Sequence, residues 1–400
     1  MPIALFVLGL TVFSLGTTEF MIAGLLPELS GAFGVSLPQA GLLISLFAVG
    51  VVIGAPLITA ATTKVPRKTA LVALLAVFIA GEVLAAAAPS FGVLMAARVV
   101  TAVAHGSFFG IGAVVASNLV EPGKRARAIA IMFGGLTIAT IAGVPLGTFV
   151  GQHFGWRATF LAVAVLGVID LIGVLALVPH QPRAGHLGLR HELAAFRNPK
   201  VWLALGTTAL SQAALYTAYT YIAPLLTDFT GFSAGMVPPL LALFGFGTFL
   251  GSVLGGKLAD RSLMGTLCAG LLLLAVMLGA FSLAAHSKPA MIGTLFLFGI
   301  GSFLINPALQ TRVMNETEGA PTLASTSNIS AFNVGNALGP WLGGVGLSAG
   351  AGLLSPSWIG AGLAVASLVV ALGAVGLDRR TGKEVNSDAG RTRELVEGSR

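Results

Sequence analysis

Charged residues are scarce in this chain. Asp, Glu, Lys and Arg make up 9% of its 400 residues, whereas 56% are hydrophobic. A soluble domain carries roughly a quarter charged residues, so this chain has too few polar side chains to cover a soluble core. The apolar runs are continuous, whereas the strands of a membrane barrel alternate apolar and polar residues. The composition therefore predicts an all-α integral membrane protein.

Cysteine is almost absent as well. Cys268 is the single one, so an internal disulfide is impossible. The chain also lacks the patterns His-Glu-x-x-His and Gly-Lys-Ser/Thr, and it has no cluster with metal-ligand spacing. We therefore expect no metal, no cofactor and no enzyme activity, and energy from an ion gradient in place of bound ATP.

Apolar runs long enough to cross a bilayer fill most of the chain, with hardly any gap between them. The first run is too long for a cleavable signal peptide and leads directly into structure. We expect twelve spans, near residues 3–27, 37–61, 69–88, 91–118, 127–150, 157–178, 201–226, 235–258, 264–285, 289–311, 323–349 and 353–377.

The net charge of +7 reports topology and does not indicate nucleic acid. With these spans, nearly every Lys and Arg falls on one side of the membrane, and only Arg157 and Lys288 fall on the other. Cytoplasmic loops carry such an excess, so both termini are expected in the cytoplasm. The residues on the basic side are Lys64, Arg67, Lys68, Lys124, Arg125, Arg127, Arg183, Arg190, Arg197, Lys200, Lys257, Arg261, Arg312 and those of the tail.

The chain divides into two halves of six spans. The predicted domains are an N-terminal bundle (1–178), a cytoplasmic linker (179–200), a C-terminal bundle (201–377) and a disordered tail (378–400). The linker is either an amphipathic helix at the headgroups or a solvated connection.

Glycine stripes repeat between the halves with a shift of roughly 195 residues. Glycine at every fourth position lets helix backbones approach closely in a membrane. The stripes fall in spans 2, 5, 8 and 11, and we expect the two bundles to meet on these helices. The stripes are Gly50 and Gly54; Gly143, Gly147 and Gly151; Gly247, Gly251 and Gly255; and Gly335, Gly339 and Gly343.

Three motifs resemble the major facilitator superfamily, in particular its twelve-span drug:proton antiporters. The first is Gly256-Lys257-Leu258-Ala259-Asp260-Arg261 after span 8, which matches the cytoplasmic gate motif. The second is Arg98 followed by His105-Gly106 in span 4. The third is the antiporter motif of span 5, with an apparent second copy in span 11. The antiporter-motif residues are Gly143, Pro145, Gly147, Gly339, Pro340 and Gly343.

Span 1 refines this resemblance. Its segment Gly16-Thr17-Thr18-Glu19-Phe20 is similar to arabinose-efflux-permease-like transporters and to the chloramphenicol exporters of actinomycetes. The resemblance implies twelve helices in two six-helix bundles related by pseudo-two-fold symmetry. It also implies a monomer in the inner membrane of a bacterium, with protons, lipid and a small-molecule substrate as its partners.

The first gate motif departs from the family pattern. After span 2, Thr63 stands where an aspartate is expected, although the basic residues Lys64, Arg67 and Lys68 are kept. The missing carboxylate removes a contact with a helix N-terminus, worth about 1 kcal/mol. We expect Asp260 to supply the equivalent contact alone.

Glu19 is the single carboxylate of an otherwise uncharged apolar span, so it is expected to face a partner or a cavity. At 1.5 Å per residue, Glu19 and Arg98 both lie roughly 12 Å from the outer face, so the two can meet. The resemblance supports proton coupling by this pair, and the alternative is a structural ion pair that never titrates. His105, two turns after Arg98, is either a proton relay or a packing residue. Glu82 is a weaker coupling candidate that could simply reach interfacial water.

Span 7 carries all three tyrosines, and Gln212, Tyr216 and Tyr219 form one stripe on it. Tyrosine rings suit a flat, moderately polar ligand, although an interfacial belt is the competing interpretation. Asn306 in span 10 and Asn333 in span 11 are either ligand contacts or interhelical hydrogen-bonding groups.

The sequence as a whole predicts proton-driven export of small, largely apolar compounds, with chloramphenicol a candidate. Export of a sugar or another metabolite is the alternative, which a more polar cavity would favour. A membrane-embedded enzyme or sensor would need a catalytic constellation or a polar domain, and the chain has neither.

Overall fold

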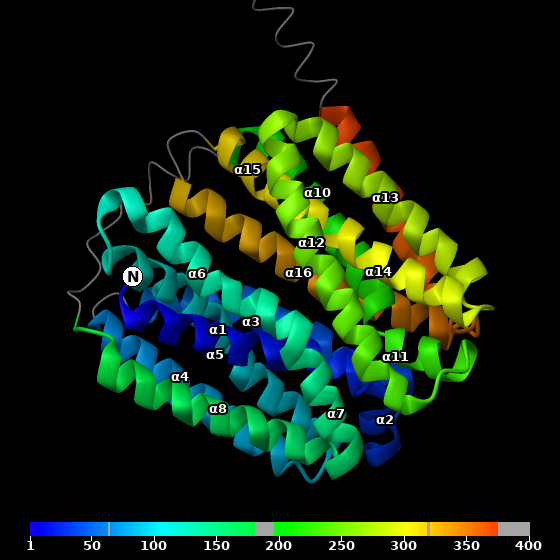
Figure 1. Ribbon diagram of the computed structural model, residues 1–400, viewed down its shortest axis with the longest axis horizontal. Coiled ribbons are helices and arrows are strands. Elements are labelled where there is room, and N and C mark those ends of the chain that lie inside the picture. Colours follow the sequence, from blue (N-terminus) through cyan, green and yellow to red (C-terminus); the bar gives the residue numbers. More distant parts are fainter. Residues whose placement is uncertain (63–64, 181–195, 318–320, 375–400) are drawn as a thin grey trace, which may run out of the picture.

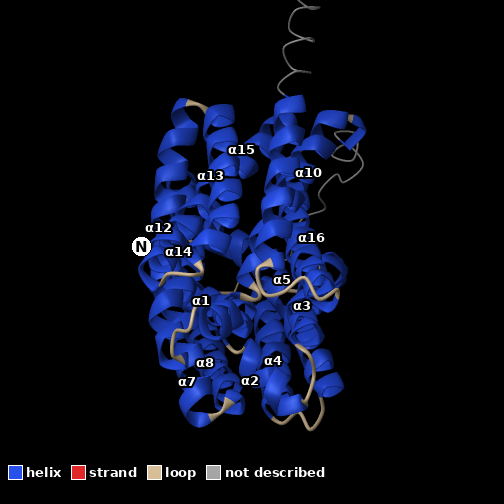
Figure 2. Cartoon of the chain, turned by 90° about the vertical axis from the view of Figure 1, so that its right-hand side faces the viewer, coloured by secondary structure: helices blue, strands red, loops and turns tan. Residues whose placement is uncertain are grey.

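The computed structural model describes residues 1–62, 65–180, 196–317 and 321–374. Within these ranges every regular element is a helix (Figure 2). The sequence-based expectation of an all-α membrane protein is therefore confirmed.

The described part of the N-terminal half consists of ten helical elements. Pro145 cannot donate a backbone hydrogen bond, and a π-helical turn, η2, directly precedes α7. The elements are α1 (Ile3–Gly24), α2 (Leu26–Phe33), α3 (Leu37–Ala61), α4 (Arg67–Ala86), α5 (Phe91–Asn118), η1 (Pro122–Lys124), α6 (Arg125–Ile138), η2 (Ala139–Gly143), α7 (Val144–Phe154) and α8 (Trp156–Leu177).

The C-terminal half follows the same plan, with a second π-helical turn, η4, directly after Pro224. Its elements are α10 (Pro199–Tyr219), α11 (Ile222–Pro224), η4 (Leu225–Phe229), η5 (Ala234–Met236), α12 (Val237–Arg261), α13 (Leu263–Ala284), α14 (Lys288–Leu304), α15 (Asn306–Glu316), α16 (Pro321–Ser348) and a last helix over Ser355–Ala374.

Ten helices of the described residues are long and apolar enough to cross a membrane, so this is a multi-pass membrane protein. The two remaining expected spans correspond to α10 and its continuation, and to α16. Both form long helices, but Thr, Ser, Gln and Asn lower their hydropathy. As the polar residues of α10 are almost entirely buried, this helix faces protein more than lipid.

The helices form two bundles that follow each other in the chain (Figure 1). In the N-terminal half α3 and α4 pack on α5, and α1 packs on α6 and α8. In the C-terminal half α12 and α13 pack on α14, and α10 packs on α16. The pairs α3 with α5 and α12 with α14 occupy equivalent positions in the repeat, as the glycine pattern predicts.

The glycine stripes pack inside each bundle. Gly50 lies against Ala102 of α5, and Gly247 lies against the Phe296 carbonyl of α14. Gly147 lies against Thr159 of α8 and Met21 of α1. The stripe of α16 follows the backbone of α10 in the same way. The stripes therefore hold each bundle together, while other faces of the same helices meet the opposite bundle.

The expectation that the bundles meet on spans 2, 5, 8 and 11 is confirmed. α3 packs on α16, and η2 and α7 pack on α12. The Ser45 hydroxyl donates to the Ala337 carbonyl at 2.7 Å, and the Thr140 and Thr248 hydroxyls lie 3.3 Å apart. These hydroxyl groups make polar contacts between the bundles at both interfaces.

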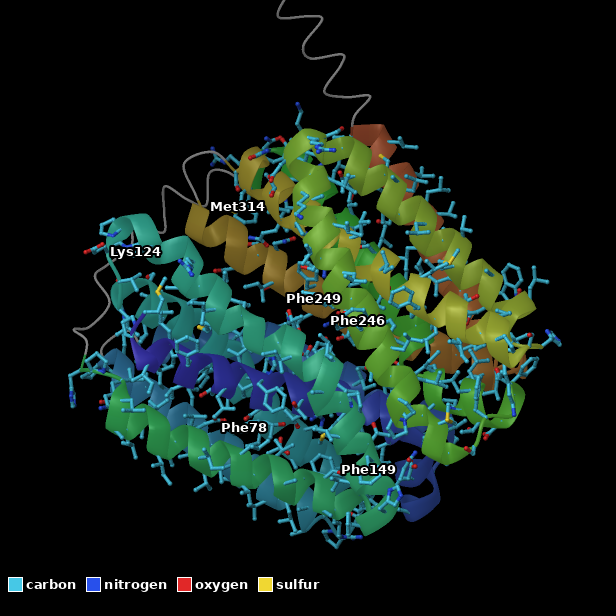
Figure 3. The ribbon with its side chains drawn as sticks, in the orientation of Figure 1. Phe78, Lys124, Phe149, Phe246, Phe249 and Met314 are labelled. Atoms are coloured by element: carbon cyan, nitrogen blue, oxygen red, sulfur yellow. The ribbon has the colours of Figure 1, made fainter. Side chains whose placement is uncertain are left out.

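The halves converge at one end of the molecule, which we call the α2–α11 end. There α11 contacts α1 and α2, and Gly344 of α16 lies against Pro38 of α3. The opposite end includes the start of α6 from the N-terminal half and the end of α15 from the C-terminal half. Lys124 and Met314 mark these two places in Figure 3. We call this second end the Lys124–Met314 end.

Some sequence-based predictions fall outside the described residues. These are the gate residue Lys64, most of the linker (181–195) and the tail (378–400). The domain boundaries remain predictions.

The close contact of α12 with α14 generates a stability prediction. A Cβ on Gly247 would lie 2.5 Å from the Phe296 carbonyl oxygen, whereas a Cβ on Gly256 of the same helix would meet nothing within 4 Å. Gly247→Ala should lower stability by about 1–3 kcal/mol, because backbone must shift to admit the methyl group. Gly256→Ala should be neutral or stabilising by up to about 1 kcal/mol. Thermal unfolding of the purified protein in detergent measures both, and equal Tm values for the two variants would contradict the packing.

Candidate functional site

Glu19 lies where the two halves face each other. Its side chain is 12% exposed, and its Oε2 lies 3.3 Å from His105 Nε2 of α5. Its Oε1 accepts a hydrogen bond from Asn336 Nδ2 of α16 at 3.5 Å. The carboxylate therefore bridges one histidine of its own bundle and one amide of the opposite bundle, as expected for an ionisable group within a membrane protein.

Aromatic rings enclose His105. Its imidazole stacks on Phe109 with the ring centroids 4.7 Å apart, and Phe47 meets it edge-on at 5.2 Å. Phe109 in turn contacts Phe133 of α6 at 5.5 Å. These rings exclude water from one side of the imidazole, so its polar contact is directed toward Glu19.

Arg98 is almost completely buried on the same face of α5, at 1% exposure. Its Nη1 donates to the Thr18 carbonyl at 2.9 Å and to the Thr18 hydroxyl at 3.1 Å. The guanidinium carbon lies 4.1 Å from the centroid of the Phe47 ring, which is cation–π geometry. Phe47 therefore contacts both Arg98 and His105.

The predicted direct contact between Glu19 and Arg98 is not what the structure shows. The guanidinium bonds to Thr18, the residue directly before Glu19, and the carboxylate of Glu19 points to His105. The depth estimate placed both residues at the same level but could not give the direction of their side chains. His105, predicted as a relay or a packing residue, holds the position next to Glu19.

Glu82 belongs to the same polar cluster through Thr18. The Thr18 hydroxyl donates to Glu82 Oε1 at 2.7 Å and accepts from Arg98. Glu82 is 0% exposed, so it does not reach interfacial water as the sequence allowed. Glu82 of α4 is therefore connected to Arg98 of α5 through a threonine of α1.

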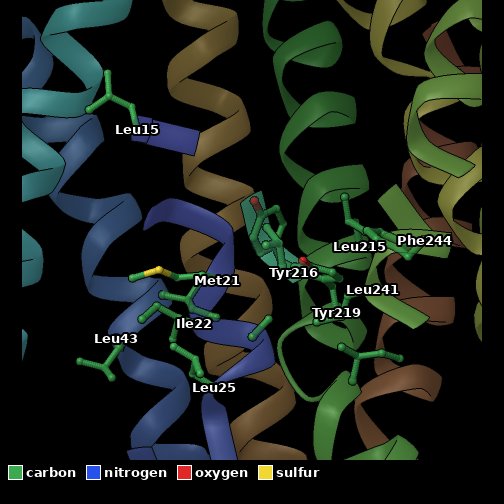
Figure 4. Close-up of a cluster of buried hydrophobic side chains, with 14 of the residues drawn as sticks. Leu15, Met21, Ile22, Leu25, Leu43, Leu215, Tyr216, Tyr219, Leu241 and Phe244 are labelled. Atoms are coloured by element: carbon green, nitrogen blue, oxygen red, sulfur yellow. The ribbon is translucent and has the colours of Figure 1, made fainter. Parts of the chain in front are cut away.

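The predicted cavity tyrosines come together with Phe20. Tyr216 lies 6.4 Å from the Phe20 ring and 6.1 Å from Tyr219, and Tyr219 stacks on Phe244 at 4.9 Å. Figure 4 shows Tyr216 between Met21 and Ile22 of the N-terminal half and Phe244 of the C-terminal half. The aromatic stripe of α10 therefore faces the opposite bundle at the level of Glu19.

The predicted amides bond mainly to the protein. Gln212 Nε2 donates to Asn306 Oδ1 at 3.2 Å, so α10 and α15 are joined by these two side chains. Asn333 Nδ2 donates to the Ile329 carbonyl of its own helix at 3.0 Å. These amide groups therefore make hydrogen bonds within the C-terminal half.

The gate residues lie at helix ends. Lys68 Nζ donates to the Leu175 carbonyl at 2.7 Å, near the C-terminal end of α8, where a cation is favourable. Arg67 begins α4, and Asp260 and Arg261 end α12. Asp260 is exposed, and within the described residues it makes no hydrogen bond or ion pair. Among the described residues, Asp260 thus has no hydrogen-bonded contact with a helix N-terminus.

Thr18, Phe47 and Phe109 were missed by the sequence analysis. Thr18 directly precedes Glu19, and Phe109 follows His105 by one helical turn, so spacing alone could have suggested both. Phe47 carries no such signal, because it comes from another helix. Asp170 is fully buried on α8, and neither of its oxygens has a hydrogen-bond partner in the described part of the chain.

Comparison with known proteins identifies the family. The sequence profile described as "Major Facilitator Superfamily" matches residues 8–329. This chain belongs to the major facilitator superfamily. It is a membrane transporter and not an enzyme, because the members of this superfamily it matches are transporters.

Two relatives cover nearly the whole transporter. The inner membrane transport protein YdhP of Escherichia coli (strain K12) is 44% identical over 87% of this chain and 90% of its own length. The chloramphenicol resistance protein of Streptomyces lividans is 38% identical over 93% of this chain and 96% of its own length.

A solved structure shares the fold. A bacterial homologue of the human lysosomal transporter Spinster, described as inward-facing and unoccupied, superposes with a TM-score of 0.71. It covers 92% of this chain and 94% of its own, at 20% identity. Together with the two bundles, this confirms the major facilitator fold.

The role of Thr18 can be tested through stability. Thr18→Val removes the hydroxyl that joins Arg98 to Glu82 and leaves buried polar atoms without a partner, at a cost of about 1–3 kcal/mol. Thr11→Val is the matched control, since the buried Thr11 hydroxyl donates only to the Val7 carbonyl one turn earlier. Thermal unfolding should show a clearly lower Tm for Thr18→Val than for Thr11→Val. Indistinguishable Tm values would mean that the cluster contributes no stability.

Proposed function

We propose that this transporter is a proton-driven exporter of small, largely apolar, drug-like compounds, with chloramphenicol a candidate. The observation that carries the proposal is the partly exposed carboxylate of Glu19 against His105 at the interface of the halves. A proton carrier has to gain and lose a proton, so it needs access to water and a partner for each state. Glu19 has both.

The neighbouring charges divide into two roles in this proposal. Glu19 and His105 exchange the proton, because they lie at the interface and contact each other. Arg98 and Glu82 are buried and fixed by Thr18, so they set the electrostatic environment of the site. Arg98 lies close enough to act on both Glu19 and Glu82.

The cargo is inferred from the lining. Phe20, Tyr216, Tyr219 and Phe244 offer apolar ring surface with a few hydroxyl groups. The amides of Gln212 and Asn306 bond to each other, so few free polar groups remain to replace the water around a sugar. This favours an apolar cargo over a sugar or a similar metabolite, and the name of the Streptomyces relative adds chloramphenicol as a specific candidate.

The orientation of the transporter in the membrane follows from the positions of its basic residues. Arg67, Arg125 and Arg261 stand at helix ends that belong to the Lys124–Met314 end. We place this end in the cytoplasm of a bacterium, with both termini on that side and the α2–α11 end facing outward. The conformation described here is then closed to the outside, and we expect the protein to act as a monomer.

The first experiment identifies the cargo. Labelled candidate compounds, chloramphenicol among them, are incubated with cells that do or do not produce the protein, with and without a protonophore. Lower accumulation in producing cells, restored by the protonophore, is the expected result. A sugar as the exported compound would favour the alternative cargo, and export that survives the protonophore would overturn proton coupling.

Glu19→Gln tests the proton site. The amide keeps the shape of the side chain but cannot titrate, so pH-driven uphill export of the identified cargo should fall to background while some binding remains. Proteoliposomes with an imposed pH gradient give the measurement. The control is Glu121→Gln, which removes an exposed carboxylate paired only with Lys124. Unchanged gradient-driven export by Glu19→Gln would sink the assignment.

Asp260→Asn tests the gate. We propose that Asp260 contacts a helix N-terminus when the cytoplasmic end closes, so losing its charge should weaken that closed state by about 1 kcal/mol. The expected result is a transport rate several-fold lower with an unchanged Kd for the cargo. A large loss of binding affinity would instead place Asp260 in the binding site.

A further inference from the structure

Asn336 belongs to the C-terminal half and makes a hydrogen bond to Glu19 across the interface. It lies on α16, is 7% exposed, and directs its amide across the interface to Glu19 Oε1 at 3.5 Å. The other carboxylate oxygen of Glu19 faces His105 of its own half. Any movement that separates α1 from α16 at this level therefore breaks the contact with Asn336 and leaves the contact with His105.

The amide of Asn336 has an unused acceptor. Its Oδ1 is buried and has no hydrogen-bond partner among the described residues. Buried amide oxygens normally accept a hydrogen bond, so the lack of a partner for this Oδ1 needs a physical reason. An ionised carboxylate only accepts hydrogen bonds, whereas a protonated one carries an O–H donor. The free Oδ1 therefore offers an acceptor for the donor that appears when Glu19 takes up a proton.

We infer that Asn336 is a positioning residue through which the C-terminal half responds to the protonation of Glu19. Its amide N–H binds the carboxylate, and its amide oxygen binds the carboxylic acid. This inference rests on the proposed proton coupling at Glu19 and adds to it the contact that passes the change from one half to the other.

The hydrogen bond between Asn336 and Glu19 differs in strength between the ionised and the protonated state of Glu19. A hydrogen bond to an ionised carboxylate is roughly twice as strong as one between neutral groups. Deprotonation of Glu19 therefore tightens the contact between α1 and α16, and protonation loosens it. The balance between the two arrangements of the halves then depends on pH.

Several other charged or titratable groups lie near Glu19. His105 contacts it from α5, Arg98 acts on it from the same helix, and Tyr216 and Tyr219 face it from α10. Glu82 of α4 is connected only through Thr18 and Arg98. Apart from the two α10 tyrosines these groups belong to the N-terminal half, and Asn336 is the side chain of the C-terminal half that makes a hydrogen bond to Glu19.

The test measures the distance between the halves without any cargo. Gly123→Cys and Met314→Cys, both exposed at the Lys124–Met314 end, are spin-labelled in a Cys268→Ser background in lipid nanodiscs. A Cβ on Gly123 meets nothing within 4 Å, so the label fits there. The distance distribution is recorded by pulsed electron paramagnetic resonance from about pH 4 to 8, where carboxyl and imidazole groups titrate.

The parent protein should change its distance distribution with pH. Asn336→Leu, similar in size but without donor or acceptor, should reduce that change to less than about half, since the contact that depends on charge is gone. Asn336→Gln keeps both groups and should restore the change. If Asn336→Leu does not fold, as judged by its Tm, Asn336→Ala replaces it with the same expected loss.

A full pH response in the Leu and Ala variants would overturn the inference. Glu19→Gln in the same labelled background separates this outcome from failure of the proton site. A response lost in Glu19→Gln and kept in Asn336→Leu overturns the role of Asn336 alone. A response kept in Glu19→Gln, or absent from the parent, contradicts the proton site together with the role of Asn336.

Discussion

A carboxylate at membrane depth has to find a partner, and the site of this transporter is arranged around that requirement. An unpaired charge there costs several kcal/mol, so Glu19 is held between His105 of its own bundle and Asn336 of the other. The hydrogen bond from Asn336 to Glu19 thus has two consequences. It satisfies the carboxylate, and in our proposal it also makes the arrangement of the two halves depend on the protonation of that carboxylate.

Close backbone packing gives each half the rigidity that such a dependence needs. Glycines on α3, α12 and α16 let neighbouring helices of the same bundle approach until backbone meets backbone, and Gly147 of α7 leaves room for side chains of α1 and α8. The faces between the bundles have fewer such contacts and include isolated hydroxyl pairs, such as Thr140 with Thr248. A small local change at the interface can therefore move one bundle against the other while each keeps its own packing.

The buried charges around the site do not all have the same freedom. Glu82, Thr18 and Arg98 form a cluster that is closed to water and lies entirely within the N-terminal half. Its hydrogen bonds would have to break for any member to move, so it acts as a fixed support. Phe47 links this support to His105, since its ring contacts both the guanidinium and the imidazole. One aromatic ring thus lies between this buried cluster and the imidazole that contacts Glu19.

The sequence by itself determined the fold class, the glycine repeat and the helices on which the halves meet. These follow from periodicity and composition, because a bilayer leaves a chain with few ways to bury its backbone. It also predicted Glu19, Arg98 and His105 as proton-coupling residues and Tyr216 as a cavity residue, because charged and hydroxyl groups stand out in an apolar span. The tertiary structure decided which of them touch. Arg98 bonds to Thr18, His105 takes the place beside Glu19, and Asn336 joins them from the other half. Depth along a helix can be counted from the sequence, but the direction of a side chain depends on how neighbouring helices are rotated, and only packing fixes that.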